Sequence, residues 1–213
     1  MNNIYPKIFG WMFIGLLVTF ITGYTVSLNE TMLYNIFSNW INLIIIIIIE
    51  FAIAIYLTAR IRKLSPPVAT ILFLLYSFIT GLTFAVIFVV YNLSSIIWIF
   101  LVTAILFAIF AIVGYITKID LTKIHTYLFM ALLGVILLGI INAFVKSANL
   151  DMGLCIVSMI IFIGFIAYDT QKIKKLYGTL DDNNLAIIGA FQLYLDFINL
   201  FLDLLKLFGE RKD

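Results

Sequence analysis

The last apolar stretch of the chain carries five polar side chains at helical spacing. Because successive residues of an α-helix point about 100° apart, these five share an arc of about 80°. They form the polar stripe: Gln192, Asp196, Asn199, Asp203 and Lys206. A carboxylate such as Asp196 is costly inside a long apolar helix, so it indicates an ion path, a proton path or a buried ion pair. The simpler alternative is a hydrogen-bonded seam that joins neighbouring helices.

Other ionisable residues lie where they could act together with Asp196. Glu50 is predicted to lie about 14 Å from the inner end of its helix, and Asp196 about 16 Å from the same side. Asp169 closes the preceding apolar segment, and Arg60 and Arg62 follow the segment that contains Glu50. We therefore expect Glu50 and Asp196 to share one level in the membrane. We also expect one of the two arginines to pair with Asp169.

These residue types predict a site that binds cations and responds to protons. Acids that share a low-dielectric site cannot all ionise cheaply, so they titrate as a coupled unit. Calcium prefers several oxygen ligands, and protons compete for the same oxygens. We expect Asp169, Asp196 and Glu50 to bind ions and sense pH, with the two aspartates as the calcium ligands. Pairing with Arg60 or Arg62 would close the inner end until Asp169 is protonated. Further polar residues of the predicted pore are Gln192, Asn199 and Asp203.

The composition is that of a membrane protein. Of 213 residues, 64% are hydrophobic and only 11% are charged, too few charges for a soluble surface. The net charge of +2, without a basic run among aromatic residues, argues against nucleic-acid binding. No serine, threonine or cysteine pairs with a base, and no histidines or cysteines share metal-ligand spacing. We expect neither an enzyme nor a resident cofactor.

The apolar segments predict seven membrane-spanning helices, since each crossing needs about 20 apolar residues. The predicted spans are Ile8–Val26, Ser38–Ala59, Val68–Tyr91, Ile96–Ile116, Tyr127–Val145, Leu150–Tyr168 and Leu185–Phe208. The seventh is long enough but is interrupted by Asp196 and Asp203. The loops are short and no internal repeat is visible, so residues 1–213 are expected to form a single membrane domain. Gly10, Gly15 and Gly81 are expected to allow close approach between helices.

Lysine and arginine counts predict the orientation in the membrane. With the N-terminus inside, nine basic residues lie in inner segments: Lys7, Arg60, Arg62, Lys63, Lys118, Lys123, Lys172, Lys174 and Lys175. Four lie in outer segments: Lys146, Lys206, Arg211 and Lys212. The N-terminus is therefore expected in the cytoplasm and the C-terminus outside, unless the seventh segment is re-entrant. Lys63 and the lysines within residues 172–175 are interpreted as ordinary surface-seeking residues.

Two aspartate motifs lie near the end of the chain: AYDTQKI over Ala167–Ile173 and LYLDFINLFL over Leu193–Leu202. Together they resemble the signature of the Bax inhibitor-1 family, also called the transmembrane Bax inhibitor motif (TMBIM) family. Further segments are similar to its bacterial members: Gly10–Thr19, Ser65–Thr70, Phe73–Tyr76, and Gly114–Tyr115 ahead of Lys118. The resemblance covers nearly the whole chain.

The resemblance implies an all-α bundle of seven helices in which the C-terminal helix is central. It also implies a pH-sensitive calcium leak through a pore gated by an aspartate dyad, which would be Asp169 and Asp196. The family's acidic residue in the second helix maps to Glu50, and its gating arginine to Arg60 or Arg62. The bacterial-type segments imply the plasma membrane of a prokaryote. The expected partners are the lipid bilayer, calcium ions and protons.

Two other functions stay open from the sequence. The chain could be a membrane interaction protein that regulates a membrane protease or a stress or cell-death partner, although no surface motif identifies one. It could also transport another cation or a small solute. This third function is less favoured, because the chain lacks a repeat with paired interrupted helices.

Overall fold

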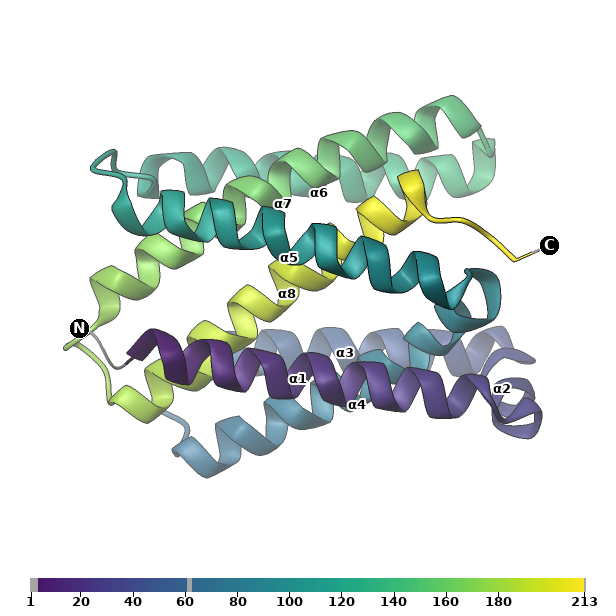
Figure 1. Cartoon of the computed structure of the whole chain (residues 1–213), viewed down its shortest axis with the longest axis horizontal. Coiled ribbons are helices and arrows are strands. Elements are labelled where there is room, and N and C mark those ends of the chain that lie inside the picture. Colours follow the sequence, from purple (N-terminus) through teal and green to yellow (C-terminus); the bar gives the residue numbers. More distant parts are fainter. Residues whose placement is uncertain (1–3, 61–62, 213) are drawn as a thin grey trace. The chain divides into compact units, whose positions relative to one another are not determined.

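The structure is a computed structural model that describes residues 4–60 and 63–212 (Figure 1). Over these residues it consists of eight α-helices without a named strand, which confirms the all-α prediction. The helices are α1 (Ile4–Ser27), α2 (Glu30–Phe37), α3 (Trp40–Arg60), α4 (Pro66–Val90), α5 (Leu93–Ile116), α6 (Thr122–Val145), α7 (Ala148–Leu176) and α8 (Asp182–Phe208).

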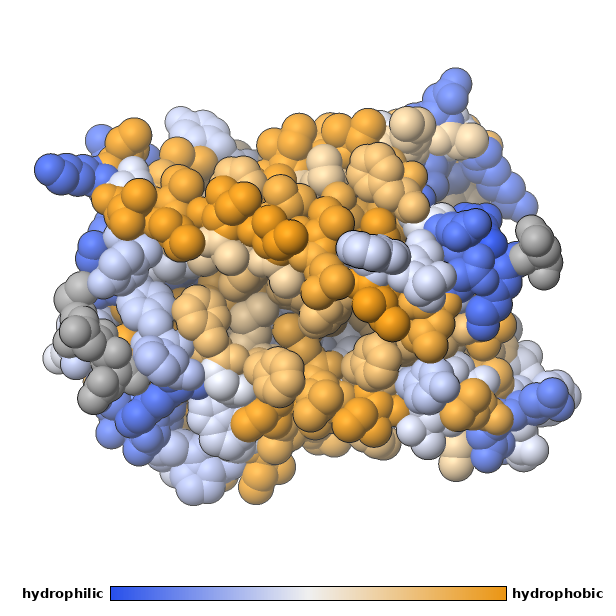
Figure 2. All heavy atoms as spheres, viewed as in Figure 1, coloured by the Kyte–Doolittle hydropathy of each residue, from blue (hydrophilic) through white to orange (hydrophobic). Residues whose placement is uncertain are grey.

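Every described helix except α2 is long and apolar enough to cross a membrane. These seven helices correspond to the seven predicted spans. Figure 2 shows hydrophobic residues running along the exposed side of α5. The exposed positions there include Ile97, Leu101, Ile105, Ile109 and Ile112. Such an apolar surface is suited to lipid, and helices can cross lipid because they satisfy their backbone hydrogen bonds internally. The protein is a multi-pass membrane protein.

Apart from shifts of a few residues at other helix ends, the structure differs from the predicted elements in three places. α2 was not predicted; it begins after Asn29, whose side chain accepts a hydrogen bond from the Met32 amide at 3.0 Å. α7 continues to Leu176, so Asp169 lies inside a helix rather than at the end of one. α8 begins at Asp182 and is continuous, because neither Asp196 nor Asp203 interrupts its backbone.

The chain divides into two compact units. The first contains the described residues of Met1–Asn92, Leu176–Tyr194 and Arg211–Asp213, and the second contains Leu93–Lys175 and Leu195–Glu210. α8 contributes residues to both units, and 78% of its most apolar window is buried, against 39% or less in the other six spans. α8 is therefore the most buried of the seven described spans.

In the first unit, α1 packs along α4 through small residues (Figure 1). A methyl group at Gly81 would lie 2.5 Å from Cβ of Thr22, and one at Gly15 would overlap the ring of Phe73. Gly15 and Gly81 therefore allow the close approach that was predicted for them. The prediction for Gly10 was wrong, because no heavy atom of the described residues, apart from the local helix backbone, lies within 4 Å of the position its Cβ would take.

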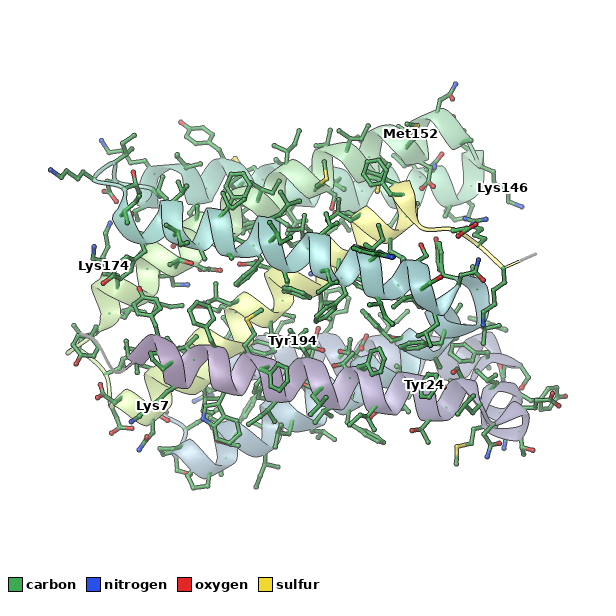
Figure 3. All side chains as sticks on the ribbon, viewed as in Figure 1. Lys7, Tyr24, Lys146, Met152, Lys174 and Tyr194 are labelled. Atoms are coloured by element: carbon green, nitrogen blue, oxygen red, sulfur yellow. The ribbon has the colours of Figure 1, made fainter. Side chains whose placement is uncertain are left out.

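Buried hydrogen bonds add to this packing. The hydroxyl of Thr19 on α1 donates to the backbone of α4 at Ser77 O (2.9 Å). It also lies 2.6 Å from the phenol oxygen of Tyr194, the labelled residue of α8 in Figure 3. These contacts tie α1, α4 and the first half of α8 together by groups that lipid could not satisfy.

Candidate ion-binding site

Asp196 is fixed by the aromatic packing of the residue that follows it. The ring of Phe197 lies 5.1 Å from that of Phe100 and 5.7 Å from that of Phe107, both on α5. Because adjacent helical residues point about 100° apart, seating Phe197 against α5 also fixes the direction of Asp196. Asp196 is only 5% exposed, and its Oδ2 has no hydrogen-bond partner among the described residues.

Asp169 is the second buried acid of this unit, at 8% exposure. The carboxyls of Asp169 and Asp196 lie within electrostatic range of one another, and we refer to them as the aspartate pair. A buried carboxylate oxygen without a protein partner is stabilised by a proton or a cation. The pair therefore has the chemistry of a site where the two compete.

Lys172, which lies on α7 with Asp169, pairs with one member of the aspartate pair. The Nζ atom of Lys172 lies 3.5 Å from Oδ1 of Asp169, one helical turn away. It also lies 5.6 Å from the ring centroid of Tyr168. Lys172 is the ion-pair partner that the structure gives Asp169, whereas the sequence had assigned this lysine to the membrane surface.

The end of α7 also holds the loop between α5 and α6. The side-chain amide of Gln171 donates to the carbonyl of Ile119 (2.8 Å) and accepts from the amide of Leu121 (2.9 Å). Lys174, labelled in Figure 3, donates to the Tyr115 carbonyl at 2.9 Å and lies over the Tyr115 ring. These contacts position the turns of α7 that follow Asp169.

Asp120 in this loop is predicted to contribute an acid-sensitive part of the stability. Hydrogen bonds from Lys175 and Thr122 hold the pKa of Asp120 below its usual range. Such a carboxyl stabilises the fold above its unfolded pKa of about 3.9, and the contribution is lost as the pH falls through the lower folded pKa. Thermal unfolding in detergent should therefore show that wild type is more stable than Asp120→Asn at neutral pH.

The difference in stability between wild type and Asp120→Asn should be small, because Asp120 and Lys175 are exposed to solvent. The difference should shrink as the solution is acidified below about pH 4. If wild type gained stability over Asp120→Asn on acidification, the assignment of this ion pair would be wrong.

The far end of the polar stripe makes contacts with α7 as well. The thiol of Cys155 donates to the backbone oxygen of Asp203 at 3.3 Å, and Nζ of Lys206 lies 2.6 Å from Oδ1 of Asp151. The side chain of Asn199 donates to the carbonyl of Leu195 in its own helix. At Asp203 and Lys206 the stripe thus resembles the polar seam that was the simpler alternative.

Glu50 lies in the first unit, on α3, and is half-buried. Its carboxyl interacts electrostatically with the phenol of Tyr76 and with the hydroxyl of Thr80, both on α4. One carboxyl oxygen, Oε1, has no hydrogen-bond partner among the described residues. Because Glu50 and Asp196 belong to different units, their common level stays a prediction.

The remaining predicted site residues are Arg60, Arg62 and Gln192. Arg60 is the exposed last residue of α3 in the first unit, and Arg62 lies outside the described residues. The pairing of either arginine with Asp169 stays a prediction. Gln192 is half-buried in the first unit, and its Oε1 has no described partner.

Sequence reasoning missed Gln171 and Lys172. The three-residue spacing between Asp169 and Lys172 is a recognised helical pairing distance and could have indicated the ion pair. Gln171 gave no comparable signal, because its partners lie in the loop between α5 and α6, far away in the sequence.

Within residues 4–60 and 63–212, no group of three or more His, Cys, Asp or Glu side chains could hold a metal ion. Two carboxylates can still coordinate a passing cation together with water or carbonyl oxygens.

Comparison with known proteins identifies the family. Residues 1–213 match the family described as "Inhibitor of apoptosis-promoting Bax1". The "Inner membrane protein YbhL" of Escherichia coli (strain K12) is 43% identical over 212 residues, which cover 97% of this chain and 91% of the relative. An "Uncharacterized protein" of Borreliella burgdorferi is 40% identical over 217 residues, covering 100% and 94%. The chain therefore belongs to the Bax inhibitor family, as its two aspartate motifs predicted.

Proposed function

We propose that the protein is a calcium leak channel whose rate depends on pH through the aspartate pair. The observation that carries this proposal is the buried Asp196 carboxyl, which has an unpartnered oxygen and lies within electrostatic range of Asp169. Two like charges at one buried site repel, and either a proton or a cation relieves the repulsion. Calcium is the favoured cation, because carboxylate oxygens are its preferred ligands.

Protons would act on this calcium leak in two ways. They compete with calcium for the carboxylate oxygens of Asp169 and Asp196. They also remove the attraction between Asp169 and a cationic side chain that closes the inner end. We propose Arg60 or Arg62 for that closing role and Glu50 as a further acid along the path. No chemical transformation is part of the proposal, so the protein would act without catalysis.

The proposed location is the plasma membrane of a bacterium. The Escherichia coli relative is named an inner membrane protein, and a relative in Streptococcus pyogenes serotype M1, 33% identical over 222 residues, is named a membrane protein. The distribution of basic residues supports a cytoplasmic N-terminus and an outer C-terminus.

Calcium flux into liposomes that contain the purified protein tests this function. Wild type should pass calcium at a rate that varies with pH, and Asp169→Asn or Asp196→Asn should each lower the flux strongly and remove its pH dependence. A wild type that passes no calcium at any pH would refute the proposal.

A second candidate is a membrane interaction protein, which the family description favours because it names inhibition of another protein. The partner would be a membrane protease or a stress or cell-death protein. Absence of flux together with copurification of a partner in constant ratio would favour this candidate over the channel.

A further inference from the structure

We propose that Lys172 is a tethered cation, an ammonium group that occupies the aspartate pair and must leave it before a calcium ion can bind. The inference rests on the proposed function, because it names the group that regulates cation binding at the same site. It concerns a residue that neither the motifs nor the comparisons assign to the pore.

The contacts of Lys172 are those of a bound cation. Its Nζ atom lies 3.5 Å from the Asp169 carboxylate, and the side chains of Lys172 and Asp169 are 33% and 11% exposed. The same ammonium attracts the Asp196 carboxyl. The face of the Tyr168 ring, 5.6 Å away, provides a further favourable surface for positive charge. One amine thus contacts one acid of the pair and lies within electrostatic range of the other.

The helix turn that carries Lys172 is held in place by its neighbours. Gln171 and Lys174 are both engaged with the segment that links α5 to α6. These bonds fix the last turns of α7, while Lys172 keeps a flexible four-carbon side chain that can swing away. A lysine so placed can leave the carboxylates without unwinding the helix.

The charges explain why Lys172 would regulate binding. One ammonium balances only part of the charge of two ionised carboxylates, so the site still attracts a divalent cation. That cation must displace the ammonium, and the displacement weakens its binding. Removing the ammonium should lower the calcium concentration for half-maximal flux, by roughly threefold to tenfold for one partly exposed ion pair.

The experiment measures calcium-dependent flux in liposomes for Lys172→Gln, Lys172→Arg and Lys175→Gln at one pH. We expect Lys172→Gln to need roughly threefold to tenfold less calcium for half-maximal flux. Lys172→Arg keeps the charge and should behave as wild type. Lys175→Gln is the matched control, since it removes a lysine that pairs with Asp120 in the loop.

A second measurement tests the ion pair without any flux. A double-mutant cycle of thermal unfolding with Lys172→Gln and Asp169→Asn should show that the two substitutions are not additive. Additive effects, or an unchanged calcium requirement in a conducting Lys172→Gln, would overturn the tethered cation and leave the channel intact. A wild type that passes no calcium would instead refute the proposed function, and the competition with it, even where the cycle shows coupling.

Discussion

Asp196→Asn is expected to reduce calcium flux by roughly tenfold to a hundredfold, because it removes one of the two charged ligands of the site. Asparagine has nearly the same shape as aspartate but carries no charge, so the packing of Phe197 against Phe100 and Phe107 should be preserved. The substitution also removes a buried charge with an unpartnered oxygen, which should leave stability unchanged or raise it. The flux should fall in a protein that is still folded.

The matched control is Asp151→Asn, which removes the same charge from an exposed acid paired with Lys206. Its flux should equal that of wild type. If the two variants lost flux equally, the effect would reflect the overall charge of the protein rather than the aspartate pair. An Asp196→Asn variant with wild-type flux would remove this residue from the pathway.

Gly114→Ala is expected to destabilise the protein by about 1–3 kcal/mol, since its added carbon would overlap a neighbouring backbone. That carbon would lie 2.7 Å from Cα and 2.8 Å from the carbonyl carbon of Ala167, and it would overlap the carbonyl oxygen. A backbone cannot rotate aside as a side chain can, so α5 and α7 would have to separate. Alanine's helix propensity, better than that of glycine by about 1 kcal/mol, would offset only part of this.

The same substitution should disturb the candidate site, because Asp169 follows Ala167 by two residues on α7. The control is Gly139→Ala in α6, where the added carbon would have no neighbour within 4 Å in the described part of the chain beyond the local helix backbone. This control should be neutral or slightly stabilising in thermal unfolding in detergent. Equal stability of Gly114→Ala and Gly139→Ala would contradict the close approach of α5 and α7.

The spanning helices could be predicted from sequence because their length and hydropathy are set by the membrane itself. α2 could not be predicted in this way, since its eight residues are too few to cross a membrane. The end of α7 was misplaced because the polar run over residues 169–175 marks the surface by composition. The structure shows that these residues stay helical through contacts with the loop between α5 and α6.

The acids of the candidate site could be predicted because a buried carboxylate in an apolar helix is rare enough to be informative. Their partners could not, because they depend on packing between segments distant in sequence. Asp203 shows the difference: the sequence placed it in a polar stripe, but its contact with Cys155 depends on how α7 meets α8. The ion pair of Asp169 with Lys172 could have been predicted from their spacing. It was missed because clustered lysines also mark the inner membrane surface.

Release of protons when calcium binds tests the competition at the aspartate pair most directly. Calcium is added to the purified protein in weakly buffered detergent solution at several pH values, and a pH indicator records the protons set free. Because a cation displaces protons from its ligands, wild type should release protons, and Asp169→Asn and Asp196→Asn should not. Asp151→Asn should release as many protons as wild type. Calcium binding without release at every pH, or undiminished release from Asp196→Asn, would contradict a site shared by calcium and protons.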